Sequence, residues 1–159
     1  MQMSVQHAAS NRDTVSGVKS PDPQGELILA VEDDKMLRDF LNIVLGESGY
    51  RVMLAADGTE AVQRYMEHAN EISLVLLDMG LPGMSGEEVL SKIVTSRPDL
   101  KVIAVGGLIR AKARSAVMQL GAHDYISKPY VGKELLDIVH DTLRSRVQAG
   151  SCAQVGNNS

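Results

Sequence analysis

Charged residues stand directly after three strand-like runs of this 159-residue chain. Glu32, Asp33 and Asp34 follow the run 27–31, Asp78 follows the run 72–77, and Lys128 follows the run 124–127. Three carboxylates brought to one place repel one another unless a cation lies among them. Carboxylate oxygens suit Mg²⁺, which completes its octahedron with water and phosphate oxygens. These residues therefore predict a magnesium site, provided that the fold brings the three runs together.

Each charged group also has a simpler interpretation. The acidic run from Glu32 could complement the N-terminal dipole of a following helix. Asp78 could open the turn that begins at Gly80, and Lys128 could be a solvated surface lysine. The functional interpretation depends on coincidence, because three independent strand ends would deliver complementary charges to one sheet edge.

The elements that must position these residues alternate in type along the chain, which is typical of an α/β protein with a parallel sheet. Strands are expected at 27–31, 50–56, 72–77, 102–105 and 124–127. Helices are expected at 35–48, 59–68, 85–97, 110–120 and 133–147. Ser85 and Glu88 form a capping-box pattern, and Gly49 and Gly121 follow helices as C-terminal stops. The pattern predicts five strands and five helices.

The composition narrows the class of protein. Hydrophobic residues make up 44% of the chain and the formal net charge is −4, so nothing attracts nucleic acid or an anionic membrane electrostatically. Cys152 is the single cysteine, which excludes an internal disulfide, and the four histidines show no metal-ligand spacing. No signal peptide or membrane-spanning run is evident. We expect a cytoplasmic protein that has neither nucleic acid nor membrane as a partner.

The two ends of the chain differ from its centre. Residues 1–25 and 148–159 are polar and lack any helical or strand period, so we expect disordered tails. One domain is expected between them, at 26–147.

Three motifs resemble the receiver domain of the response regulators of bacterial two-component systems. They are Ala30-Val31-Glu32-Asp33-Asp34, Leu76-Leu77-Asp78-Met79-Gly80-Leu81-Pro82-Gly83-Met84-Ser85-Gly86 and Tyr125-Ile126-Ser127-Lys128-Pro129-Tyr130. The resemblance implies a doubly wound, flavodoxin-like sheet with strand order 2-1-3-4-5, and a cis bond between Lys128 and Pro129.

The resemblance also implies roles for individual residues. Asp78 would be the phosphorylated nucleophile, and Lys128 would contact the phosphoryl group. Glu32, Asp33, Asp78 and the backbone carbonyl of Met79 would bind Mg²⁺. Phosphoryl transfer needs an in-line nucleophile and positive charge around the phosphoryl oxygens, which this set can supply.

One position departs from the family pattern. The family places Ser or Thr at the end of the fourth strand, where this chain has Gly106. Tyr125 matches the aromatic residue that turns inward in the family when that hydroxyl binds phosphate. We therefore expect a weakened link between phosphorylation and conformational change.

The main functional hypothesis is a response regulator in phosphorelay signal transduction. Asp78 would accept a phosphoryl group from a histidine kinase or histidine phosphotransferase and then switch the binding of an unknown downstream protein. The chain would be no enzyme beyond its own phosphotransfer and dephosphorylation. No output domain is evident, so we expect a stand-alone module or a receiver excised from a hybrid kinase.

Three alternative functions are an adaptor, a hydrolase and a flavin-binding protein. A phosphorylation-independent adaptor is favoured by Gly106 and opposed by the intact acidic set. A hydrolase of the haloacid dehalogenase type needs a second Asp where Gly80 stands. A flavin-binding protein needs a phosphate loop after the first strand, where the acidic run from Glu32 would repel phosphate.

Overall fold

The computed structural model describes residues 25–107 and 111–145. The tails predicted at 1–25 and 148–159 lie outside the described residues, except for Gly25.

Five parallel strands form one sheet in the order β2-β1-β3-β4-β5. The strands are β1 (Leu27–Val31), β2 (Arg51–Ala55), β3 (Ile72–Asp78), β4 (Lys101–Gly106) and β5 (Asp124–Ser127). This confirms the predicted doubly wound, flavodoxin-like α/β fold, because the chain steps from β1 to β2 in one direction and then from β2 to β3, β4 and β5 in the other, which places right-handed crossovers on both faces.

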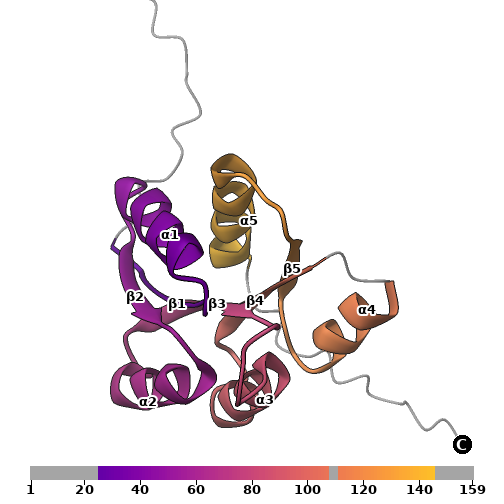
Figure 1. Cartoon of the computed structure of the whole chain (residues 1–159). Helices are drawn as coiled ribbons and strands as arrows, with labels where there is room; N and C mark the ends of the chain where they lie inside the picture. The colour runs from indigo at the N-terminus through magenta and orange to yellow at the C-terminus, as the bar shows by residue number, and fades with distance from the viewer. Residues whose placement is uncertain (1–24, 108–110, 146–159) are drawn as a thin grey trace, which may run out of the picture.

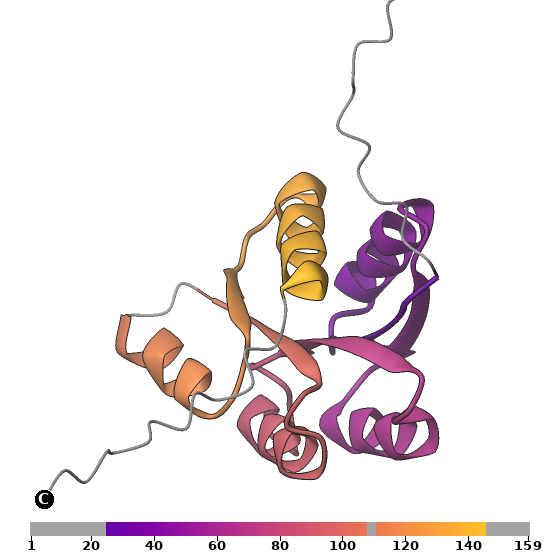
Figure 2. The same ribbon diagram turned by 180° about the vertical axis from the view of Figure 1, so that it is seen from behind.

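Five helices cover the two faces of the sheet. They are α1 (Lys35–Glu47), α2 (Gly58–His68), α3 (Gly86–Ser96), α4 (Ala111–Gln119) and α5 (Gly132–Arg144). Helices α1 and α5 pack on one face, and α2, α3 and α4 on the other, as the two opposite views show (Figures 1 and 2).

Two apolar layers, one on each face of the sheet, make up the core. In β3, Leu74 and Leu76 pack into the layer beneath α1 and α5, whereas Val75 and Leu77 pack into the layer beneath α2 and α3. Because both faces are covered, a central strand needs an apolar residue at every position. This explains why the sequence shows continuous apolar runs rather than alternating ones.

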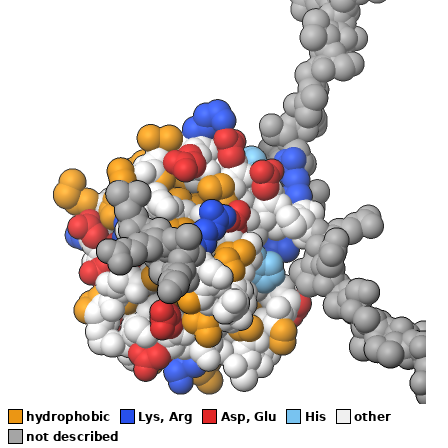
Figure 3. All heavy atoms as spheres, turned by 90° about the vertical axis from the view of Figure 1, so that its right-hand side faces the viewer, with side chains coloured by type: hydrophobic (Ala, Val, Ile, Leu, Met, Phe, Trp, Pro, Cys, Tyr) orange, Lys and Arg blue, Asp and Glu red, His pale blue; other side chains and the backbone are white. Residues whose placement is uncertain are grey.

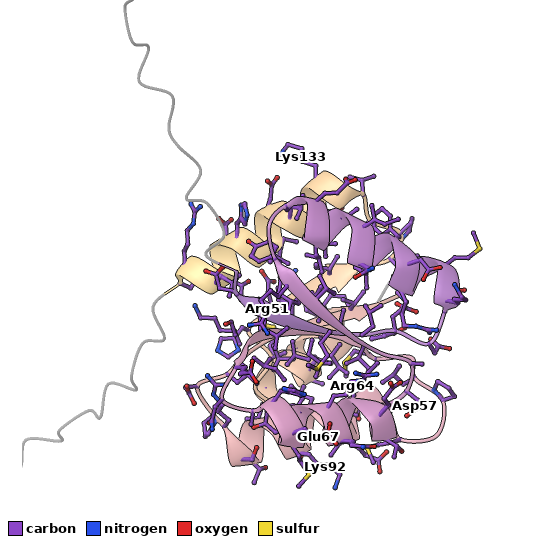
Figure 4. The ribbon with its side chains drawn as sticks, turned by 90° about the vertical axis from the view of Figure 1, so that its left-hand side faces the viewer. Arg51, Asp57, Arg64, Glu67, Lys92 and Lys133 are labelled. Carbon is purple, nitrogen blue, oxygen red and sulfur yellow. The ribbon has the colours of Figure 1, made fainter. Side chains whose placement is uncertain are left out.

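Side chains at the helix starts satisfy free backbone N–H groups. The Ser85 hydroxyl accepts a hydrogen bond from the Glu88 N–H, and the Glu88 carboxylate accepts one from the Ser85 N–H, which confirms the predicted capping box. The Asp57 carboxylate caps α2 by accepting a hydrogen bond from the Glu60 N–H, at the end of that helix where Asp57 is labelled in Figure 4. Gly49 and Gly121 adopt positive φ values of 91° and 110° after α1 and α4, as expected of helix stops.

Strand β4 is longer than predicted, because it begins at Lys101 and ends at Gly106. The Lys101 ammonium donates a 2.6 Å hydrogen bond to the Leu143 carbonyl near the end of α5, which lets a charged residue begin a buried strand. Asp78 is likewise the last residue of β3 rather than the first of a loop, since it pairs with Val105.

Candidate functional site at the carboxyl edge of the sheet

The predicted site residues come from the carboxyl ends of β1, β3 and β5. Strands β1 and β3 are direct neighbours, and Val31 pairs with Leu77, so Glu32 and Asp78 follow paired positions. Lys128 follows β5, at the sheet edge beyond β4 (Figure 1). A doubly wound sheet binds its ligands at this edge, where the strand order reverses.

The Lys128 ammonium lies between two buried carboxylates. Its Nζ is 2.7 Å from Glu32 Oε2 and 2.8 Å from Asp78 Oδ2. Glu32 is 2% exposed and Asp78 is 5% exposed, so bulk water solvates neither carboxylate well. A buried charge must be paired or metal-bound to be tolerated, and Lys128 provides that pairing here.

The other oxygen of each carboxylate accepts a backbone hydrogen bond. Glu32 Oε1 accepts from the Asp34 N–H at 3.2 Å, and Asp78 Oδ1 accepts from the Gly80 N–H at 2.8 Å. These bonds fix the orientation of both side chains.

Asp34 has a different task from its acidic neighbours. Its side chain caps α1 by accepting hydrogen bonds from the backbone N–H groups of Met36 and Leu37, at 2.8 and 3.0 Å. The helix-capping interpretation of the acidic run is therefore correct for Asp34, whereas the buried Glu32 lies in the site.

The structure brings Glu32, Asp33 and Asp78 close enough to share one cation. A carboxylate oxygen from each lies within 4.8 Å of the others, with Asp33 exposed and the other two buried. An all-oxygen set that is open to solvent on one side fits Mg²⁺, which retains some of its waters. Met79 lies beside this set and its N–H donates to the Val105 carbonyl at 2.8 Å, while its own carbonyl remains a predicted ligand.

Burial and charge shift the pKa values of the site in opposite ways. Burial raises the pKa of the Glu32 carboxyl; the Lys128 hydrogen bond opposes this effect and the Asp78 charge adds to it. Burial alone would lower the pKa of Lys128, but its hydrogen bonds to Asp78 and Glu32 outweigh burial and raise it. Lys128 therefore remains a cation at neutral pH.

Gly106 and Tyr125, the two predicted switch positions, lie on the neighbouring strands β4 and β5. Gly106 is buried, pairs with Ser127, and accepts a 2.6 Å hydrogen bond from the Lys128 N–H. Tyr125 is 6% exposed, and its hydroxyl donates to the Gly107 carbonyl at 2.9 Å. Burial and the Asp78 charge raise the pKa of this hydroxyl.

Two contributors to the site escaped the sequence analysis. Arg38 of α1 donates hydrogen bonds to the carbonyl oxygens of Glu32 and Asp33. Gly86 packs so closely that a Cβ there would lie 2.6 Å from the Asp78 carbonyl oxygen and the Met79 Cα. The sequence gives no signal for Arg38 beyond its helical position, whereas Gly86 belongs to the motif that begins at Leu76.

An apolar cavity of about 400 Å³ adjoins the site between α1 and the segment that follows β5. It is lined by Leu37, Phe40, Lys128, Pro129 and Tyr130. The Lys128–Pro129 peptide bond is cis, as the resemblance implied.

Comparison with known proteins agrees with this fold. Residues 28–140 match the response regulator receiver domain family. The chain therefore belongs to the receiver domains of response regulators, as the motifs indicated.

Individual relatives place the chain within that family. It is 34% identical over 117 residues to the sensory transduction protein RegX3 of Mycolicibacterium smegmatis, covering 74% of this chain and 50% of RegX3. It is 35% identical over 117 residues to the uncharacterized transcriptional regulatory protein YkoG of Bacillus subtilis, with the same coverage. The chain thus spans about half the length of these curated relatives.

Among solved structures, the chain resembles a CheX–CheY complex with BeF₃ and Mg²⁺ from Borrelia burgdorferi. The TM-score is 0.70 at 29% identity, covering 72% of this chain and 87% of that one.

These relatives correct one expectation. The net charge led us to expect no part for nucleic acid, but YkoG is named as a transcriptional regulatory protein. Figure 3 shows acidic, basic and apolar side chains interspersed over the described atoms of one face. The net charge of the chain is therefore a poor guide to whether nucleic acid has a part in its function. Among the described residues, no helix has the length and apolar character needed to cross a membrane.

Proposed function

We propose that this receiver domain accepts a phosphoryl group on Asp78 from a phosphohistidine of a histidine kinase or histidine phosphotransferase. The observation that supports this most directly is the position of Lys128. Its ammonium contacts the carboxylate of Asp78, which together with Glu32 and Asp33 forms an acidic cluster that could hold a metal ion. An ion pair that served only the stability of the fold would need Lys128 and Asp78, but not the carboxylates of Glu32 and Asp33 beside them.

In the proposed step a carboxylate oxygen of Asp78 forms a bond to phosphorus while the bond from phosphorus to the donor imidazole nitrogen breaks. The imidazole takes up one proton from solvent water and leaves as the neutral base. Lys128 remains protonated and pairs with the negative phosphoryl oxygens. Backbone bonding by Gly80 keeps the Asp78 carboxylate in place.

Glu32, Asp33 and Asp78 would hold Mg²⁺, with the carbonyl of Met79 as a proposed fourth ligand. When bound, the metal supplies positive charge that stabilises the transferred phosphoryl group. The matching CheX–CheY structure contains Mg²⁺ and BeF₃, and the shared fold and the acidic cluster support the same ion here.

We infer that the output of the complete protein is regulatory. The relationship to YkoG supports control of transcription through a DNA-binding segment or partner. We also propose that the domain acts in the cytoplasm and turns over no substrate other than its own phosphoryl group.

A second candidate is an adaptor that works without phosphorylation. Gly106 favours it, because no side-chain hydroxyl at that position can bind a phosphoryl group.

Intact-mass measurement after incubation with Mg²⁺ and acetyl phosphate tests the acceptor role. We expect the parent to gain one acid- and base-labile phosphoryl group, and Asp78→Asn to gain none. Asp39→Asn is the matched control, because Asp39 is exposed and pairs with Lys35 on the surface. Equal labelling of the Asp78→Asn variant would exclude Asp78 as the acceptor, and an unlabelled parent would favour the adaptor.

A further inference from the structure

Arg38 lies on the first turns of α1 and reaches back to the acidic loop. Its Nη1 donates to the Glu32 carbonyl at 2.8 Å and to the Asp33 carbonyl at 2.7 Å. One nitrogen thus bridges two consecutive peptide groups, and their side chains are two of the three carboxylates that fit a metal. We propose that Arg38 is a positioning residue, which holds this loop so that both carboxylates face Asp78. The inference rests on the proposed metal-dependent function.

The acidic loop needs such a restraint because its carboxylates repel one another and that of Asp78. Glu32, Asp33 and Asp34 are consecutive acidic residues, and the first two must approach a third carboxylate, that of Asp78. Like charges at this spacing repel and would drive the loop outward. The positive guanidinium of Arg38 offsets part of that repulsion. Because it binds the backbone carbonyls of the loop, it leaves the carboxylates free to bind a metal.

The acidic loop that Arg38 holds is also bonded to the loop that follows β2. The Glu32 N–H donates to the Ala55 carbonyl at 3.1 Å, and the next N–H, that of Ala56, donates to Glu60 Oε2 at 2.8 Å. The pKa of Glu60 is lowered mainly by this Ala56 bond and by Arg64, with a smaller contribution from Arg38. Arg38 therefore acts within a connected set of bonds that ties the start of α2 to the acidic loop.

Charge and position have opposite effects on metal binding, which makes the proposal testable. A positive charge near the site repels Mg²⁺, so a purely electrostatic role predicts that Arg38→Gln binds Mg²⁺ more tightly and Arg38→Lys binds it equally well. A positioning role predicts weaker binding in both variants, since the side chains of lysine and glutamine are shorter than that of arginine and do not place a nitrogen where Nη1 donates to both carbonyls. Loss of an outer-shell partner of a metal ligand typically costs about tenfold or more in affinity.

The experiment is calorimetric titration of Mg²⁺ into the parent, Arg38→Gln, Arg38→Lys and a charge control, Lys35→Gln. Lys35 is exposed on the same helix and pairs with Asp39, so its replacement removes a nearby positive charge without touching the loop. We expect the Mg²⁺ dissociation constant to rise about tenfold in both Arg38 variants and to stay within about twofold of the parent in Lys35→Gln. Amide NMR shifts of Asp33 and Asp34 without metal should move in the Arg38 variants alone.

Arg38→Gln with parental or tighter Mg²⁺ binding overturns the positioning role, and so does Arg38→Lys with parental binding. A parent that binds no Mg²⁺ overturns the proposed metal site together with this inference. If Arg38→Gln fails to fold, the comparison of Arg38→Lys with the parent decides the question.

Discussion

The hydroxyl of Tyr125 donates a 2.9 Å hydrogen bond to the carbonyl of Gly107, one residue beyond the end of β4. The aromatic side chain of β5 is thereby tied to the loop that follows β4 by its own hydroxyl.

Tyr125→Phe removes only this bond. We expect the free energy of unfolding to fall by about 1 kcal/mol, the usual contribution of one hydrogen bond, as measured by urea denaturation. Tyr65→Phe is a useful comparison, because it removes the Tyr65–Ser96 bond between α2 and α3. An unchanged midpoint for Tyr125→Phe would show that the bond contributes nothing.

Gly106→Thr restores a hydroxyl at the end of β4. Hydrogen bonds to charged groups contribute about 1.5–3 kcal/mol, enough to bias a two-state equilibrium. We expect a modest NMR change at Tyr125 when the parent binds beryllium fluoride, and a larger one in Gly106→Thr. Equal and full changes in both proteins would mean that another group replaces the hydroxyl.

Lys128 should be thermodynamically coupled to Asp78. Replacing Lys128 by Met in metal-free buffer leaves two buried carboxylates without their cation, and we expect a loss of about 2 kcal/mol. In an Asp78→Asn background the same replacement should cost less, because one of the two charges is gone. Strictly additive losses in urea denaturation would contradict the coupling.

Glu32 gives the metal-free protein a definite pH dependence. Burial raises its pKa above the ordinary value of 4.5, so the folded state binds the proton more tightly than the unfolded state. Protonation then stabilises the fold, and this contribution is lost as the pH rises from that value through the higher folded pKa.

The measurement compares the parent with Glu32→Gln by urea denaturation between about pH 5 and about pH 7 with EDTA present. The stability of the parent relative to Glu32→Gln should increase as the pH falls. A difference that is independent of pH would contradict the raised pKa.

Two glycines, one in the first turn of α3 and one in the last turn of α1, should respond oppositely to alanine. Gly86→Ala places a Cβ 2.6 Å from backbone atoms of Asp78 and Met79, so we expect a loss of about 1–3 kcal/mol. Gly46 lies inside α1, and apart from its chain neighbours and the backbone of its own helix no described atom lies within 4 Å of a Cβ built there. Gly46→Ala should therefore stabilise the protein by about 0.5–1 kcal/mol. Thermal denaturation of both variants tests the pair.

Much of the fold could be read from the sequence because buried parallel strands leave a strong signal. The run 72–77 is apolar at nearly every position, and it forms a strand as predicted, with side chains buried on both faces of the sheet. The boundaries of β4 were less accessible, since Lys101 enters the strand only through its bond to Leu143, a contact across 42 residues.

The residues of the site could be predicted from the sequence, but the hydrogen bonds and ion pairs among them could not. Strand order brings Glu32, Asp78 and Lys128 to one edge, but nothing local indicates that a single ammonium contacts both carboxylates. Arg38 was missed for the same reason, because its partners are backbone carbonyls and these carry no residue-specific signal.

The bond between Lys128 and Glu32 joins residues 96 positions apart and has a consequence for synthesis on the ribosome. A growing chain emerges with Glu32 first and Asp78 next, and it contains both carboxylates well before Lys128 exists. A domain generally folds as a unit, so the acidic edge has no cation to neutralise it until most of the domain has been made. The last strand to be translated, β5, brings Lys128 with it and completes the sheet and the site together.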